Sequence, residues 1–184
     1  MKSSSLLNDN YAKINQIAAR CMRIIAIVIF ATYGYTIAFS GMDQALLTIV
    51  FGLSIFVAII PTIIINIFKF DSSPSVKYIV IICICFICTM MRSIMSTYAF
   101  PIALFPILVA SLYFNQTLVL FASLLISAGI LSADVIATKY NDILIGCHFT
   151  EISETMIKYT VPHIVVLFFM SIVAYFIVSR NSMM

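Results

Sequence analysis

Charged side chains are scarce in this sequence: lysine, arginine, aspartate and glutamate make up 9% of its 184 residues, and hydrophobic residues make up 63%. Soluble domains carry roughly 25% charged residues and about 45–50% apolar ones. A chain of this length has no way to bury so much apolar surface in water, so a lipid bilayer is the expected solvent. We therefore predict one membrane domain over residues 1–184 and no separate soluble domain.

The sequence also lacks the motifs of common enzymes. It has no glycine-rich phosphate loop, no His-Glu-x-x-His pair and no Gly-x-Ser-x-Gly turn. His148 and His163 have no partner at metal-ligand spacing except Cys147, and a single Cys–His pair is a weak zinc signal. We therefore expect no enzyme, no metal and no other cofactor, and we expect lipid rather than nucleic acid as a partner.

The cysteines do not suggest a disulfide framework, because there are five of them and four lie in or beside apolar runs. Cys83, Cys85 and Cys88 fall in the middle of one such run. Charge is costly in hydrocarbon, so a reactive thiolate is disfavoured there. We interpret the three residues as small apolar packing residues, with a redox or metal role as the alternative.

Apolar runs of membrane-spanning length fill most of the chain. About 20 residues cross the hydrocarbon core as a helix, and backbone groups in lipid must be satisfied within the helix. The fold class predicted is an all-α, polytopic bundle of about six transmembrane helices. The spans are approximately 22–40, 44–68, 76–96, 99–114, 117–137 and 160–179. The fourth is short and contains Pro101 and Pro106, which leaves open whether it crosses fully. The fifth is rich in small residues and is expected to be the buried central helix.

Lysine and arginine residues predict the orientation, because they are enriched in cytoplasmic segments. With the N-terminus inside, seven lie on the cytoplasmic side and three on the outer side. The inner set is Lys2, Lys13, Arg20, Arg23, Lys69, Lys77 and Arg180, and the outer set is Arg92, Lys139 and Lys158. We predict a multi-pass protein of the cell membrane with both termini in the cytoplasm.

Two segments outside the spans are amphipathic and are expected to lie flat on the membrane surfaces. Residues 1–21 form a cytoplasmic lead-in with an apolar stripe, and Asn15 falls on its polar side. The outer loop 138–159 contains a second stripe, with Glu154 and Lys158 as a favourable pair. Both segments are interpreted as interfacial anchors, with a lid or coupling role as the alternative. The stripes are Leu7, Tyr11, Ile14 and Ala18, and Phe149, Ile152, Met156 and Tyr159.

Two ionisable residues lie inside predicted spans. Arg92 is near the outer end of the third and Asp134 is near the outer end of the fifth, so they are expected at similar depth. Ionisable residues within a membrane are functional candidates. Each could instead extend to water, or the two could form a structural pair. We take Arg92, Asp134 and the neighbouring aromatic Tyr98 as candidate ligand contacts.

Three short stretches resemble the membrane region of a known family. Phe105–Leu118 contains a Phe-Pro followed by Ser-Leu-Tyr-Phe-Asn, Asn10–Ala18 is an amphipathic lead-in, and Ser179–Ser182 closes the last span. Together they are similar to the N-terminal multi-helix membrane region of Firmicute-type methyl-accepting chemoreceptors and related sensory proteins. The resemblance implies detection of a small-molecule or membrane signal, relayed to a cytoplasmic output module through which the protein would form a homodimer. It assigns no ligand-binding residues.

The sequence therefore favours a membrane-embedded sensory input domain. The alternative is a small-solute-binding membrane subunit of a transporter, similar to the substrate-binding proteins of energy-coupling factor transporters. Those proteins share the length, the six helices and the inside termini, but they usually contain more than the five glycines found in this chain. A signal passed to an output module distinguishes the first function, and tight binding of a small molecule distinguishes the second.

Overall fold

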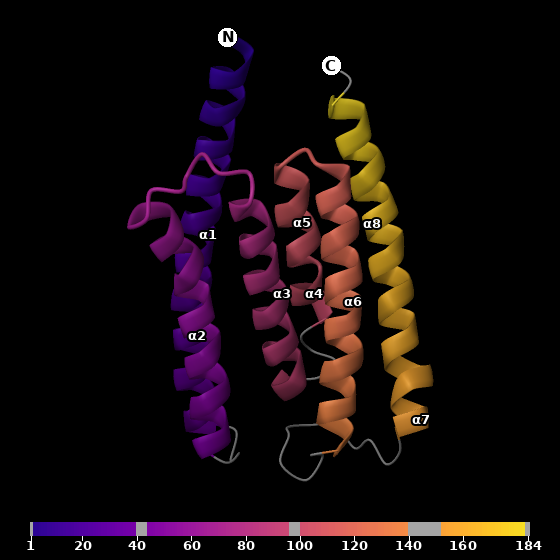
Figure 1. Cartoon of the computed structure of the whole chain (residues 1–184). Coiled ribbons are helices and arrows are strands. Elements are labelled where there is room, and N and C mark those ends of the chain that lie inside the picture. The colour runs from indigo at the N-terminus through magenta and orange to yellow at the C-terminus, as the bar shows by residue number, and fades with distance from the viewer. Residues whose placement is uncertain (1, 40–43, 96–99, 140–151, 183–184) are drawn as a thin grey trace.

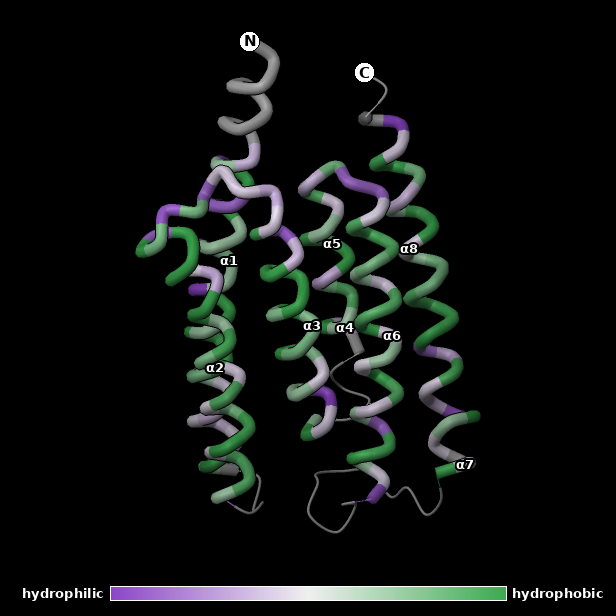
Figure 2. The backbone as a smooth tube through the Cα atoms, viewed as in Figure 1, coloured by the Kyte–Doolittle hydropathy of each residue, from purple (hydrophilic) through white to green (hydrophobic). Residues whose placement is uncertain are grey.

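The computed structural model describes residues 2–39, 44–95, 100–139 and 152–182, and the regular structure within these ranges is helical (Figure 1). Five helical stretches in the described part are long and apolar enough to cross a membrane. Hydrophobic residues run along most of the length of these helices (Figure 2). The predicted all-α, multi-pass bundle is confirmed. Its long helices are α1 (Lys2–Phe39), α2 (Gln44–Asn66), α3 (Val76–Met95), α6 (Gln116–Lys139) and α8 (Val161–Ser182).

The helices are arranged around α3. Helices α1 and α2 form an antiparallel pair on one side of α3, α5 and α6 lie on its other side, and α8 packs against α6 (Figure 1). Both chain termini lie at one end of the bundle, which we call the terminal end; the opposite end is the far end. The chain therefore makes an even number of passages, as six spans would require.

The fourth predicted span, 99–114, is broken. Helix covers α4 (Phe100–Ala103) and α5 (Phe105–Leu112), with Leu104 between them. Eight residues of α5 extend about 12 Å, well short of a hydrocarbon core of about 30 Å. Pro106 lies in the first turn of α5, where its missing N–H costs least, so the proline favours a new helix start. Helix α5 ends at the terminal end of the bundle (Figure 1).

The amphipathic lead-in is continuous with the first span. Helix α1 runs unbroken from Lys2 to Phe39, and residues 2–33 contain no proline or glycine that would bend it. Asn15 is fully buried, although the sequence placed it on the polar side. Its Nδ2 lies 2.5 Å from the Asp71 carbonyl oxygen, and its Oδ1 accepts a hydrogen bond from the Tyr113 hydroxyl at 3.0 Å. The loop between α2 and α3 therefore fixes α1 at the terminal end.

The second amphipathic segment also continues into a span. α7 (Ile152–Thr155) leads into the π-helical turn η3 (Met156–Thr160), and α8 follows without a gap. Ile152 and Tyr159 are exposed, as expected for lipid or interface contacts. Phe149 and the side chain of Glu154 lie outside the described residues, and so does the predicted Glu154–Lys158 pair.

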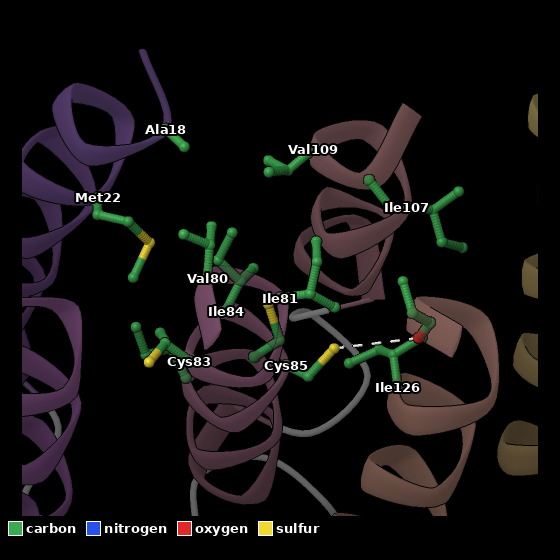
Figure 3. Packing of buried hydrophobic residues seen from close by; sticks show 14 of the residues in the cluster. Ala18, Met22, Val80, Ile81, Cys83, Ile84, Cys85, Ile107, Val109 and Ile126 are labelled. Atoms are coloured by element: carbon green, nitrogen blue, oxygen red, sulfur yellow. Dashed lines mark hydrogen bonds between the residues drawn. The ribbon is translucent and has the colours of Figure 1, made fainter. Parts of the chain in front are cut away.

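Helix α3 is the central helix, and the prediction that the fifth span would hold this place is wrong. In α3, 61% of the apolar window is buried, against 39% in α6. Cys83, Cys85 and Cys88 are each at most 6% exposed. Figure 3 shows Cys83 on the side of α3 toward the α1–α2 pair and Cys85 on the side toward α6. All three therefore lie in apolar packing, and the Cys85 Sγ is 4.0 Å from the Ala122 carbonyl oxygen.

Helices α3 and α6 approach each other closely at Gly129. A Cβ at this position would overlap Thr89 Oγ1 of α3, whose hydroxyl donates to the Cys85 carbonyl oxygen at 2.8 Å. A side chain larger than hydrogen would disturb that bond or separate the helices. This contact fixes the relative register of α3 and α6, and the same two helices carry the charged residues of the site.

Candidate functional site

The two candidate charges form a buried ion pair at the far end of the bundle. Arg92 of α3 donates from Nε to Asp134 Oδ1 at 2.8 Å and from Nη2 to Asp134 Oδ2 at 2.9 Å. Arg92 is 1% exposed and Asp134 is 3% exposed. Parallel double hydrogen bonds of this kind are strong and directional. The expectation that each residue extends separately to water is therefore wrong, and the paired arrangement is the one observed.

Two side chains from the last span complete the cluster, which we call the Arg92 network. The Thr160 hydroxyl donates to Asp134 Oδ2 at 2.6 Å. Arg92 Nη2 lies 2.9 Å from His163 Nδ1. A guanidinium has no acceptor, so Nδ1 must accept this bond and His163 must carry its proton on Nε2. The network therefore joins α3, α6, η3 and α8 and contains one positive and one negative charge.

The π-helical turn explains how the last span reaches the network. Such a turn inserts an extra residue into a helix and is common at functional sites. Thr155 and Thr160 stand five residues apart, yet both are buried, at 1% and 0% exposure. The Thr138 hydroxyl contacts the Thr155 hydroxyl at 3.4 Å and donates to the Asp134 carbonyl oxygen at 2.7 Å. The turn thus directs one face of the segment toward α6.

One donor of the network lacks a partner in the part of the chain that the structure describes. Arg92 Nη1 is buried and has no hydrogen-bond partner among the described residues. An unpaired buried donor costs about 1–3 kcal/mol, so an acceptor placed here would be bound favourably. A carbonyl or carboxylate oxygen has the required chemistry.

Burying such a network costs free energy, so it is not the most favourable way to hold helices together. Well-packed hydrophobic residues of similar volume often stabilise a fold as well as a buried ion pair, or better. Charged residues within membranes are accordingly associated with ligand and ion pathways or with proton relays. The arrangement supports a functional role for this end of the bundle.

Part of this site was found from the sequence and part was missed. Arg92 and Asp134 are brought together as one of the alternatives predicted. Tyr98, the third candidate, and His148 lie outside the described residues. Thr160 and His163 were not identified as partners. Their expected depth in the membrane could have identified them, because both lie at the outer start of the last predicted span, level with the two charges.

Comparison of the chain with protein-family models, with curated proteins and with solved structures finds no match. The fold and the Arg92 network therefore define the class: a polytopic α-helical membrane protein with a buried charged cluster at the end opposite its termini.

Proposed function

We propose that the chain is the membrane-embedded sensory input domain of a bacterial signal-transduction protein of the chemoreceptor type. The observation that carries the proposal is the course of α8. This helix begins in the Arg92 network at the far end and finishes at the terminal end (Figure 1). A change at one face of the membrane would reach a cytoplasmic output module through this single rigid element.

The packing of α8 supports such movement. Only 17% of the apolar window of this last span is buried, against 61% for α3. Besides the network, α8 contacts α6 through a hydrogen bond from the Ser123 hydroxyl to the Ser171 hydroxyl at 2.5 Å, and it packs the buried Leu167 and Val178 into the core. Elements with few buried contacts move at low free-energy cost. Changing the network should therefore shift α8 more readily than α3.

A ligand shifts such an equilibrium only by binding one arrangement better than the other. Arg92 and Asp134 are the proposed ligand contacts, together with Tyr98. Arg92 Nη1 would donate to a carbonyl or carboxylate oxygen of the ligand, and Asp134 would give up one of its present hydrogen bonds and accept one from the ligand instead. The far end would then be the signal-receiving side.

Orientation gives the first test. The lysine and arginine bias predicts that both termini lie in the cytoplasm of a cell-membrane protein. Reporters fused to the two ends should both be active only in the cytoplasm. A C-terminal reporter active only outside the cell would overturn this orientation, and with a cytoplasmic N-terminal reporter it would overturn the six-span topology as well.

Movement of α8 gives the second test. Labels at the exposed positions Ile177 of α8 and Leu120 of α6 report the distance between the two helices near the terminal end. Asp134→Asn, and the milder Thr160→Val, should shift that distance by about 1–2 Å, the scale of helix shifts in switching proteins. Lys139→Gln, an exposed change at the far end of α6, is the control. Unchanged distances in folded Asp134→Asn and Thr160→Val would contradict the proposal.

The second candidate is a small-solute-binding subunit of a transporter. Arg92 Nη1 favours it, because a neutral, buried cluster with a donor that has no partner among the described residues suits a small polar solute. This candidate predicts tight binding of a small molecule without displacement of α8. The same labels therefore distinguish the two functions.

A further inference from the structure

A second candidate site lies between α1 and α3. It is on the other side of α3 from α6, the helix that carries Asp134. A pocket of about 560 Å³ is bounded by α1 from Cys21 to Thr32, by α3 from Ile84 to Met95, and by Pro101, Ile102 and Phe105. Sites for small molecules typically measure about 300–1,000 Å³. The volume is therefore sufficient for a ligand.

The chemistry of the walls is almost entirely hydrocarbon. The polar exceptions among the lining residues are Thr32 and the thiols of Cys21 and Cys88. The Thr32 hydroxyl already donates to the Val28 carbonyl oxygen at 2.8 Å, and the Cys88 Sγ lies 3.3 Å from the Ile102 carbonyl oxygen. None of the described residues that line the pocket is charged. A polar group placed there would lose its hydrogen bonds, so the inserted part of a ligand must be apolar.

The length of the pocket indicates that its ligand is an extended chain rather than a compact molecule. From Cys21 to Thr32 the wall extends about 16 Å along α1, and half of a hydrocarbon core is about 15 Å. The pocket therefore matches the depth of one leaflet. Its rim includes Ile24, Val28 and Ile102, which are 61%, 57% and 40% exposed on the membrane-facing surface. Entry is thus open from the side, within the bilayer.

A positive charge lies where a headgroup would be. Arg20 is exposed and stands one helical turn before Ile24 on the same side of α1, because residues four apart are neighbours on a helix. Anionic lipids attract arginine and lysine residues at the cytoplasmic surface. Arg23 is also exposed, but at 100° per residue it lies on the opposite side of α1 from the pocket.

We propose that this pocket binds one acyl chain of an anionic phospholipid from the leaflet at the terminal end, with the headgroup held by Arg20. This inference depends on the membrane location of the bundle and not on the sensory role. A static α8 in the label experiment would leave it intact.

The test uses the full chain in bilayer discs that contain phosphatidylglycerol with a photoreactive group on its acyl chain. Crosslinks are expected within Cys21–Thr32 and Ile84–Met95. Val28→Trp places bulk at the exposed rim, where the fold tolerates it, and should lower crosslinking roughly tenfold, equal to about 1.4 kcal/mol. Ile27→Trp is the matched control, because Ile27 is 69% exposed and does not line the pocket. Equal crosslinking in the two variants would mean ordinary surrounding lipid and would overturn the proposal.

The headgroup is tested separately by competition. Unlabelled phosphatidylglycerol should displace the probe better than phosphatidylcholine does. Arg20→Gln should remove that preference, and Arg23→Gln should keep it. Loss of the preference in Arg23→Gln alone, or no preference in the unmodified protein, would overturn the assignment of Arg20.

Discussion

Arg92→Met and Asp134→Leu are each expected to lower the free energy of unfolding by about 3–5 kcal/mol, because each leaves one buried charge without its partner. In the unmodified protein the two side chains share two hydrogen bonds at 2.8 and 2.9 Å and are almost completely buried. Removal of Asp134 leaves the guanidinium with His163 as its one partner among the described residues. Removal of Arg92 leaves the carboxylate with the Thr160 hydroxyl.

The double variant Arg92→Met/Asp134→Leu should be more stable than either single variant. It removes both charges and fills the space with apolar groups, and such replacements are often neutral or stabilising. Unfolding in mixed micelles, followed by circular dichroism, measures all three differences. Lys139→Met, an exposed substitution near the same end of α6, serves as the control and should stay within about 0.5 kcal/mol of the unmodified protein.

Additive losses in the double variant would contradict this account. Additivity is the behaviour of residues that do not interact, whereas residues in one network show coupling of about 0.5–3 kcal/mol. If the double variant is stable but its Ile177–Leu120 distance is shifted in the label experiment, the pair serves signalling rather than folding. That combination is the result expected for a sensory domain.

The bundle itself could be predicted from the sequence because apolar runs alone determine it. A run of about 20 apolar residues in lipid forms a helix, whatever segments it packs against. Five of the six predicted spans thus correspond to α1, α2, α3, α6 and α8. The same argument is weakest for the fourth run, where Pro106 begins a new helix and the run forms two short pieces.

Relations between helices could not be predicted in the same way. Span five has more small residues, yet α3 is the central helix, because Ala128 and Ser132 of α6 are exposed. Arg92 and Asp134 were visible as charges in apolar runs. Thr160 and His163 were not, because polar residues are ordinary where a helix enters the membrane. The π-helical turn that directs Thr160 inward has no signature in single-residue propensity.

Asn15 shows the same difficulty at the terminal end. Its neighbours in sequence made it one polar residue of an amphipathic face. Its environment comes instead from residues 56 and 98 positions away, in the loop before α3 and at the end of α5. Burial of this kind depends on tertiary contacts, so no local sequence pattern predicts it.

Asn15→Leu is expected to be among the most destabilising substitutions at the terminal end. It would leave the buried Tyr113 hydroxyl without its Asn15 partner, at about 1–3 kcal/mol, and would also remove the bond to the partly buried Asp71 carbonyl oxygen, at a smaller cost. Hydrogen exchange of residues 67–75 should accelerate, because Asn15 is what joins this loop to α1. Gln16→Leu is the matched control, because Gln16 is the next residue and is exposed.

Tyr113→Phe separates the two halves of this junction. It removes only the hydroxyl, so it should cost less than Asn15→Leu and leave exchange in residues 67–75 nearly unchanged. In the double variant Asn15→Leu/Tyr113→Phe the loss should be smaller than the sum of the two single losses. Each single substitution already removes the hydrogen bond between the two side chains, so this bond is lost only once. Fully additive losses, or equal exchange in Asn15→Leu and Gln16→Leu, would show that the junction does not fix the loop. The terminal end would then depend on apolar packing of Ala18, Ala19 and Met22 against the rest of the core.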